Sequence, residues 1–248
     1  MSIAKMTPID KRDRALLEEA FPEGKDFDRA LARLKSGEPL AYVLGEWYFY
    51  GLTFKLNDAC LIPRPDTEHV VDKAIAGIKK GGCFIDLCTG SGCIAVSVLK
   101  NRPDLTAYAL DISGRALEKA KENATLNGVS DRITFIEGDV FAFEPSELPA
   151  FAAVISNPPY IRSDVVPTLE VAKSEPWEAL DGGEDVMDFY RFIIKKYCDK
   201  LTRGGEFIFE IGYDQGEAIR LLARQNGLDC EITKDYGGND RVARVTMA

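Results

Sequence analysis

The chain has 248 residues, of which 46% are hydrophobic, and its 31 basic and 40 acidic residues give a formal net charge of -9. A chain of this length can bury one substantial core, and its acidic balance argues against a broad phosphate-binding surface. We therefore do not expect a nucleic acid as the direct substrate. The composition favours a small molecule, or a neutral or basic protein surface, as the partner.

The sequence contains six cysteines without a Cys-x-x-Cys pair, and His69 is its only histidine. This composition predicts reduced, mostly buried thiols, and it predicts neither a disulfide framework nor a metal site. The N-terminus has no apolar signal segment, and no apolar run approaches the roughly 18 residues of a membrane span. We therefore expect a cytoplasmic protein that does not contact membranes.

The first part of the chain divides into two short segments. Residues 1–36 carry apolar side chains at steps of three and four, which predicts two short helices broken at Pro22-Glu23-Gly24. In residues 37–68, an aromatic run at 47–51 precedes alternating residues at 52–56, a pattern typical of a β-hairpin. A rigid linker follows, in which Asp66 or Thr67 is placed to cap the next helix.

From residue 69 to residue 248 the chain alternates between apolar strands and amphipathic helices. Such alternation predicts an α/β fold, a doubly wound, mostly parallel seven-stranded sheet of Rossmann-like type with helices on both faces. The expected strands are residues 83–87, 105–110, 133–136, 152–155, 207–211, 229–233 and 242–246. The expected helices are residues 70–78, 93–99, 115–126, 186–201 and 215–225.

A glycine-rich loop follows the first strand of this sheet and consists of Cys88, Thr89, Gly90, Ser91 and Gly92. The two glycines allow a tight turn whose backbone a ligand can touch, and the loop fits the Gly-x-Gly-x-x-Ala pattern of dinucleotide sites. Asp111 stands at the end of the next strand, where a carboxylate can accept both hydroxyls of an adenosine ribose. Taken alone, Asp111 could instead cap the helix that begins near Ser113.

Two further acids lie at or near strand ends. Asp139 follows the third strand, where it can accept from an adenine amino group while Val140 or Phe141 contacts the ring face, or can simply be a solvated turn acid. Asp86 lies inside the first strand, so its burial requires a hydrogen-bonding or charged partner.

The fourth strand ends in Asn157, Pro158, Pro159 and Tyr160. Two prolines hold this turn stiff, and neither has an N–H group, so the turn offers carbonyl oxygens together with the Asn157 side-chain oxygen. Such a site suits a planar NH2 group, with its hydrogens on the oxygens of Asn157 and Pro158 and its plane stacked on Tyr160. The alternative is an ordinary proline-rich turn after a strand.

Several motifs together resemble one enzyme family. The glycine loop, Asp111 and the Asn-Pro-Pro-Tyr turn resemble the class I methyltransferases, which use S-adenosylmethionine. Together with further stretches, the chain resembles the peptide chain release factor N5-glutamine methyltransferases. Those stretches are residues 37–45, 49–52, 61–68, 157–161, 175–185 and 235–244.

The resemblance implies a cofactor site, a substrate site and a partner. It implies that residues 88–92, Asp111 and Asn157 contact S-adenosyl-L-methionine, with Val140 lining the adenine region. Residues 157–160 would hold the glutamine amide of a Gly-Gly-Gln loop on a peptide chain release factor. Cys88 stands where the family usually has glycine, which would widen the loop slightly.

Other functions are compatible with parts of this pattern. An enzyme acting on an exocyclic amino group of a nucleic-acid base would use the Asn-Pro-Pro-Tyr turn equally well. A ribosomal protein glutamine is a closer alternative acceptor. An NAD-dependent dehydrogenase would explain the glycine loop and Asp111 but not residues 157–160. A catalytically silent S-adenosylmethionine-binding module is the remaining alternative.

Overall fold

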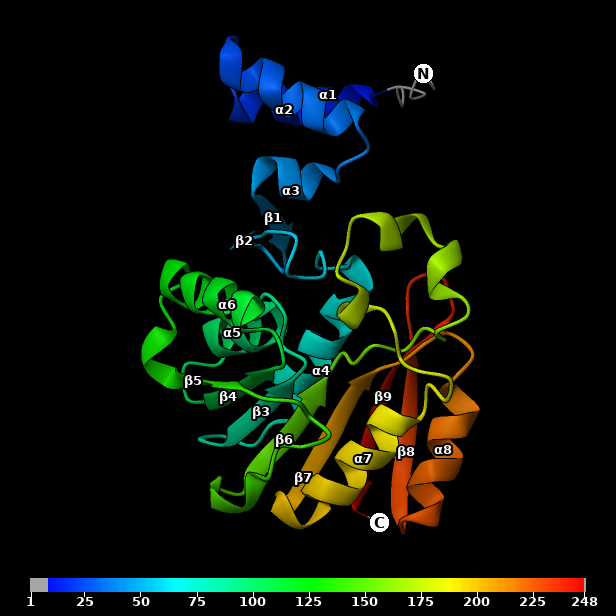
Figure 1. The fold of residues 1–248 in the computed structure, drawn as a ribbon. Coiled ribbons are helices and arrows are strands. Elements are labelled where there is room, and N and C mark those ends of the chain that lie inside the picture. The colour runs from blue at the N-terminus through cyan, green and yellow to red at the C-terminus, as the bar shows by residue number, and fades with distance from the viewer. Residues whose placement is uncertain (1–8, 248) are drawn as a thin grey trace.

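The computed structural model describes residues 9–247 and shows an α/β body with two helices standing apart from it (Figure 1). The body is built on a seven-stranded sheet of order β5-β4-β3-β6-β7-β9-β8. Neighbouring strands from β5 to β7 are parallel, and β9 pairs antiparallel with both β7 and β8. The sheet strands are β3 Cys83–Leu87, β4 Thr106–Asp111, β5 Ile133–Glu137, β6 Phe151–Ser156, β7 Leu201–Glu210, β8 Leu228–Lys234 and β9 Asp240–Met247. The predicted fold class is confirmed.

Helices cover both faces of this sheet, which explains why its central strands are mostly apolar. On one face, α4 and α5 pack over alternate residues such as Phe84 and Ala153. On the other face, α7 and α8 pack over their neighbours, such as Ile85 and Val154. Because successive side chains of a strand point to opposite faces, a strand covered on both faces is apolar at most positions. The helices of the body are α4 Glu68–Gly77, α5 Cys93–Asn101, α6 Gly114–Leu126, α7 Asp188–Tyr197 and α8 Gly216–Gln225.

The N-terminal part forms a small second core. Helices α1 Lys11–Ala20 and α2 Lys25–Lys35 are separated at the predicted break, and they pack with α3 Leu40–Leu44 through Leu17, Ala30 and Val43. The helix α3 was not predicted. The Arg33 guanidinium donates to the carbonyl oxygen of Tyr42 at 3.0 Å, so an arginine of α2 supplies a donor to α3, whose last carbonyls lack helical partners.

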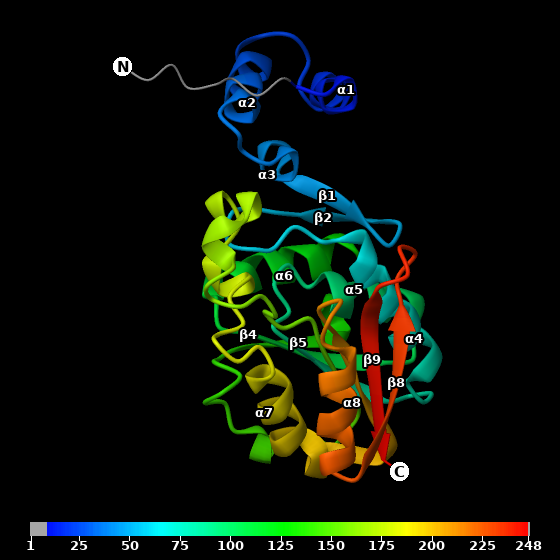
Figure 2. The same cartoon turned by 90° about the vertical axis from the view of Figure 1, so that its right-hand side faces the viewer.

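The predicted hairpin is confirmed, with strands β1 Glu46–Phe49 and β2 Leu52–Lys55. Figure 2 shows that α3 and the hairpin lie between the two N-terminal helices and the body. The hairpin is fastened to the body by Asn123 of α6. The Asn123 side chain accepts from the Lys55 backbone N–H at 2.6 Å and donates to the Lys55 carbonyl at 3.0 Å.

The boundary between α7 and β7 differs from the prediction. The predicted helix 186–201 ends as an α-helix at Tyr197 and continues as a short 3-10 turn, and β7 begins at Leu201 rather than at residue 207. The strand passes through Gly204 and Gly205 by shifting its register on β6 between Phe151 and Ala153. Glycine usually weakens a strand, but here Gly204 and Gly205 lie within β7, at the point where its register on β6 shifts.

Short 3-10 turns make up much of the long connection between β6 and α7 and also occur elsewhere. They are Pro65–Thr67, Ser130–Arg132, Pro145–Glu147, Val166–Thr168, Glu170–Lys173, Trp177–Ala179 and Cys198–Lys200. None of the helices in residues 9–247 is long and apolar enough to cross a membrane.

Candidate active site

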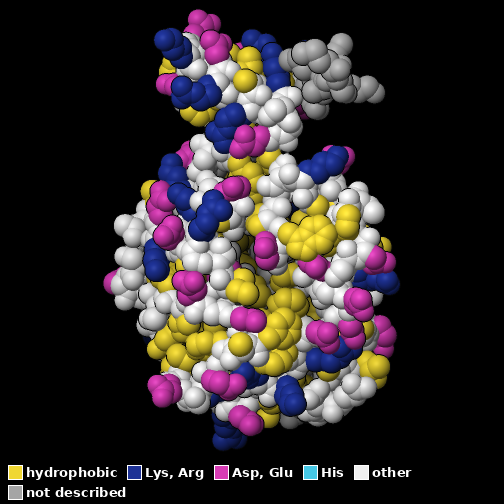
Figure 3. Space-filling model, viewed as in Figure 1, with side chains coloured by type: hydrophobic (Ala, Val, Ile, Leu, Met, Phe, Trp, Pro, Cys, Tyr) yellow, Lys and Arg dark blue, Asp and Glu magenta, His cyan; other side chains and the backbone are white. Residues whose placement is uncertain are grey.

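A cavity of about 830 Å³ opens at the C-terminal edge of the parallel strands. It is lined by the glycine loop after β3, by Asp111 after β4, by Asp139 after β5 and by Asn157 after β6. In an α/β sheet, strands that run the same way end at the same edge, so four loops far apart in sequence meet there. Figure 3 shows a hollow in this part of the molecule, with hydrophobic side chains inside it and acidic side chains around it.

The glycine loop is held in place by Asp111. The Gly90 N–H donates to one Asp111 carboxylate oxygen at 2.7 Å, and the Ser113 N–H donates to the other at 2.9 Å. Burial raises the pKa of Asp111, and these two backbone donors act against that shift. The alternative interpretation, in which Asp111 caps α6, is wrong, because at the start of α6 Asp111 accepts only from the N–H of the cap residue Ser113; Asp111 lines the cavity. Ser113 is the residue whose side chain caps α6.

Two positions of the loop show its conformational requirements. Gly92 has φ of 78°, and a Cβ atom there would lie 3.1 Å from the Cβ of Ala120, so only glycine fits without a shift. Cys88 has φ of 58°, the left-handed region in which a residue with a side chain is strained. The cysteine thus adopts a backbone conformation that favours glycine.

The loop also rests on the buried carboxyl of Asp86. The Thr89 hydroxyl donates to Asp86 at 2.6 Å, and the other Asp86 oxygen has no hydrogen-bond partner among the described residues. Burial raises the pKa of Asp86 to about 7, although the Thr89 hydroxyl and a backbone N–H lower it. Asp86 therefore has the hydrogen-bonding partner that its burial predicted, and that partner is a hydroxyl of the glycine loop.

Asp139, Val140 and Phe141 form the wall of the cavity beyond Asp111. Asp139 accepts from the Phe141 N–H at 2.9 Å, as expected of a turn acid, and it also faces the cavity. Val140 is buried, whereas the Phe141 ring is partly exposed and lies 4.6 Å from the Phe189 ring, centroid to centroid. The wall therefore presents an aromatic surface beside a carboxylate.

Only part of the Asn-Pro-Pro-Tyr turn, residues 157–160, lines the cavity. Asn157 and Pro159 line the cavity, whereas Pro158 is buried and neither it nor Tyr160 lines it. The Tyr160 hydroxyl instead donates to the Glu210 carboxylate at 3.2 Å. The stacking of a bound planar group on Tyr160 stays a prediction.

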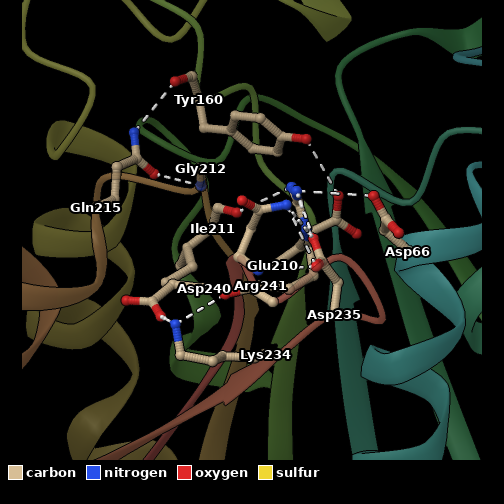
Figure 4. A network of polar contacts seen from close by, with 12 residues as sticks. Asp66, Tyr160, Glu210, Ile211, Gly212, Gln215, Lys234, Asp235, Asp240 and Arg241 are labelled. Carbon is tan, nitrogen blue, oxygen red and sulfur yellow. Dashed lines mark hydrogen bonds and ion pairs between the residues drawn. The ribbon is translucent and has the colours of Figure 1, made fainter.

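A buried polar network supports this turn from behind (Figure 4). Gln215 donates to the Tyr160 carbonyl at 3.1 Å and accepts from the Gly212 N–H at 2.8 Å. Arg241 of β9 contacts Asp235 at 3.1 Å and Asp66 at 3.7 Å, which links the C-terminal strands to the linker before α4. The turn is thus held by side chains from several separate segments.

The loop between β6 and α7 is fastened over the cavity by a buried glutamate. Glu175 accepts from the Ile62 N–H at 3.0 Å and forms an ion pair with Arg64, and its side chain is only 2% exposed. Arg64, Pro176 and Trp177 line the cavity on this side, and the Trp177 indole N–H donates to Asp181 at 3.0 Å. These contacts lie in residues 61–68 and 175–185, two of the stretches that carry the family resemblance, and their structural role was not predicted from the sequence.

The structural role of Asn123 was not predicted from the sequence, and that of Thr67 differs from its prediction. Asn123 of α6 donates to the Ser91 carbonyl at 2.9 Å, which ties the glycine loop to the helix and hairpin, and its only sequence signal was an amide on the apolar face of α6. Thr67 stands at the predicted N-cap of α4 but makes no capping hydrogen bond, and its hydroxyl faces Asn157 instead. The His69 ring lies 4.6 Å from the Tyr236 ring, centroid to centroid, in a tilted arrangement, and it does not line the cavity.

Comparisons with known proteins agree with this geometry. Residues 70–174 match the family model of the methyltransferase small domain. The chain is 41% identical over 217 residues to the release factor glutamine methyltransferase of Thermodesulfovibrio yellowstonii, covering 85% of this chain and 76% of that protein. It is 40% identical to the enzyme of the same name from Neisseria gonorrhoeae, covering 87% and 79%.

Solved structures show the same fold. The ribosomal protein L11 methylase of Lactobacillus delbrueckii subsp. bulgaricus superposes with a TM-score of 0.57 at 19% identity, covering 79% of this chain and 86% of that one. The fold and the cavity define a class I methyltransferase. Within that class, the chain belongs to the release factor glutamine methyltransferase family, whose members use S-adenosylmethionine as the methyl donor.

We predict that Arg64→Ala lowers the free energy of unfolding by about 2 kcal/mol, because it leaves the Glu175 carboxylate buried without its cation. Breaking a fully buried ion pair costs roughly 3–5 kcal/mol, and the expected loss is smaller here because Arg64 is partly exposed. Urea unfolding measures the change. The matched control is Arg162→Ala, which breaks an exposed ion pair with Asp164 on the β6–α7 loop, the loop that also carries Glu175. This substitution should change the free energy of unfolding much less. Equal effects of the two substitutions would contradict the proposed role of the buried pair.

We predict that Asp86 makes stability depend on pH. Its folded-state pKa of about 7 lies above the ordinary value of 3.8, so the folded protein holds this proton more tightly than the unfolded chain does. The free energy of unfolding should therefore fall as pH rises from about 4 to 7, by at most about 1.4 kcal/mol per pH unit from this group. Relative to wild type, Asp86→Asn should remove that part of the slope in urea unfolding. Parallel curves for the two proteins would show that Asp86 is not the source.

Proposed function

We propose that this protein transfers a methyl group from S-adenosylmethionine to the side-chain amide nitrogen (N5) of a glutamine, the one in the Gly-Gly-Gln motif of peptide chain release factors. The observation that carries this proposal is the single cavity that joins the glycine loop and Asp111 to Asn157. Membership of the release factor glutamine methyltransferase family supports the same reaction. In our proposal the protein meets the release factor in the cytoplasm.

The residues around the glycine loop fit the methyl donor. Gly90 has φ of 55° and open space where a Cβ would stand, so a ligand can approach the backbone closely there. In our proposal residues 88–92 hold the amino acid end of S-adenosylmethionine, and Asp111 accepts the ribose hydroxyls with the lone pairs that Gly90 and Ser113 leave free. Asp139 and Val140 hold the adenine. When bound, the cofactor supplies an electrophilic methyl group on a sulfonium.

The Asn157 turn provides the acceptor side of the reaction. An amide nitrogen is a poor nucleophile because its lone pair is delocalised into the carbonyl, so positioning must supply much of the rate enhancement. Oriented proximity can contribute roughly 7–11 kcal/mol in favourable cases. In our proposal the side-chain oxygen of Asn157, which lines the cavity, accepts one N–H hydrogen of the glutamine and favours the positive charge that develops on its nitrogen. That the Pro158 carbonyl accepts the second hydrogen stays a prediction, because Pro158 is buried and does not line the cavity. The buried network behind Tyr160 keeps this turn rigid.

The electrostatics of the cavity favour a protein acceptor over a nucleic acid. Asp58, Glu178 and Asp181 line the cavity together with Asp111 and Asp139. Carboxylates repel the phosphates of a nucleic-acid strand, whereas an uncharged glycine-rich loop can enter without that repulsion. The partly exposed Trp177 at the same cavity offers an apolar contact to such a loop.

The direct test is transfer of label from methyl-labelled S-adenosylmethionine to a purified release factor. We expect one methyl group per factor on the glutamine of Gly-Gly-Gln, located by mass spectrometry, and no label on the variant with alanine in its place. Ribosomal proteins and a transfer RNA serve as competing acceptors in parallel reactions. Label that persists in the alanine variant, or that appears only on a competing acceptor, would refute the proposed substrate.

We predict that Asn157→Ala lowers turnover by about 10²–10³-fold, because removing one preorganised hydrogen-bonding group from a reaction centre typically costs that much. The dissociation constant for S-adenosylmethionine, measured by calorimetry, should change less than tenfold. Asn101→Ala, on the exposed end of α5, is the control and should leave both quantities unchanged. Equal losses in turnover and cofactor affinity would place Asn157 in the cofactor site instead.

A further inference from the structure

Thr67 occupies an unusual position for a residue at the start of a helix. It is 2% exposed, lies at the N-terminus of α4, and makes no capping hydrogen bond there. Its hydroxyl oxygen instead lies 3.5 Å from the side-chain nitrogen of Asn157, 90 residues later in the chain. This separation is long for a hydrogen bond, and contacts of this kind in active sites commonly tighten when the substrate complex forms.

Glu210 lies behind Thr67, at the end of β7, and is 1% exposed. One of its carboxylate oxygens accepts from Tyr160, and the other has no hydrogen-bond partner within residues 9–247. Burial raises the pKa of Glu210 and the nearby Asp66 adds to the shift, while the Thr67 hydroxyl, the Arg241 guanidinium and the Tyr160 hydroxyl act against it. The Thr67 hydroxyl is therefore a group that stabilises the charged form of Glu210.

The donor and acceptor properties of these groups fix the direction of the contacts. In the contact between the two side chains, the Asn157 NH2 group is the donor and the Thr67 hydroxyl oxygen is the acceptor. Of the two ends of the Asn157 amide, only the NH2 end can donate to a lone pair, so this end turns toward Thr67. The carbonyl end is directed away from Thr67.

We propose that Thr67 is a positioning residue that sets the orientation of the Asn157 amide so that its oxygen faces the acceptor nitrogen. This inference rests on the proposed function of the cavity. The two orientations of an asparagine amide have nearly the same shape, and so packing alone does not distinguish them. With the opposite orientation, Asn157 would present an NH2 group to the NH2 group of a glutamine, and no hydrogen bond would form.

The test compares two substitutions at position 67. Thr67→Val keeps the shape of the side chain but removes the lone pairs, and Thr67→Ser keeps the hydroxyl but removes the methyl group. We expect Thr67→Val to lower kcat for the release factor at least tenfold, and Thr67→Ser to stay within about threefold of wild type. The dissociation constant for S-adenosylmethionine should stay within about threefold in both, which also shows that both variants are folded. No capping bond is lost in either.

A second readout reports the orientation of the amide without using the acceptor. In nuclear magnetic resonance spectra of the wild-type protein, the side-chain NH2 signals of Asn157, assigned by their loss in Asn157→Ala, should exchange slowly with water. They should shift and exchange faster in Thr67→Val but not in Thr67→Ser. This pattern would hold even if the release factor were not the substrate, so it separates the inference from the proposed function.

Two results would overturn the inference. One is a Thr67→Val variant with wild-type kcat and unchanged Asn157 signals, which would show that the hydroxyl does not orient the amide. The other is a Thr67→Ser variant as impaired as Thr67→Val, which would assign the role of Thr67 to packing of its methyl group. A wild-type enzyme that labels no release factor would instead refute the proposed substrate, and the Asn157 signals would still decide the role of Thr67.

Discussion

The central position of β3 in the sheet is the constraint on which the site depends. The chain moves outward from β3 to β4 and β5 on one side, then returns to place β6 on the other side of β3. The loops that follow β3 and β6 therefore leave neighbouring strands in divergent directions and leave a crevice between them. The glycine loop and Asn157 face each other across this crevice only because of that strand order.

Around the crevice the protein buries or half-buries several carboxyl groups, and each has hydrogen-bonding or charged partners. Asp111 accepts two backbone N–H groups, Asp86 accepts a hydroxyl, and Glu175 pairs with Arg64. A buried carboxylate without such partners would cost several kcal/mol, so each acid fixes the segments that donate to it. The cavity is thus shaped by polar contacts, whereas the two layers of helices are held by apolar packing.

The sequence predicted those parts of the structure that depend on local patterns. The apolar strands, the glycine loop and the acids at strand ends could be recognised because strand periodicity and turn chemistry involve residues close together in the chain. Helix α3 escaped prediction because five residues are too few for a helical period, and its stability comes from packing on α1 and α2. The early start of β7 depends on a register shift against β6, which no local pattern encodes.

The polar contacts of the site could not be predicted from sequence patterns, because they join residues that are far apart in the chain. Arg64 and Glu175 are 111 residues apart, and Asn123 contacts the hairpin and the glycine loop at once. Thr67 illustrates the difficulty, because its position before a helix predicts a cap, while the fold uses its hydroxyl elsewhere. Which partner a polar side chain finds is decided by tertiary structure, since a hydroxyl or an amide has several equivalent options until the fold is formed.

The same distinction explains what holds a turn with two prolines at the proposed reaction site. The prolines remove backbone freedom within residues 157–160, but they do not fix where the turn sits or which way the Asn157 amide points. Gln215 and Glu210 fix the place of the turn through the backbone and hydroxyl of Tyr160. A reaction that relies on positioning a weak nucleophile tolerates little displacement, because effective molarity falls steeply when geometry loosens. Local rigidity from the prolines and tertiary anchoring from the buried network are therefore both required.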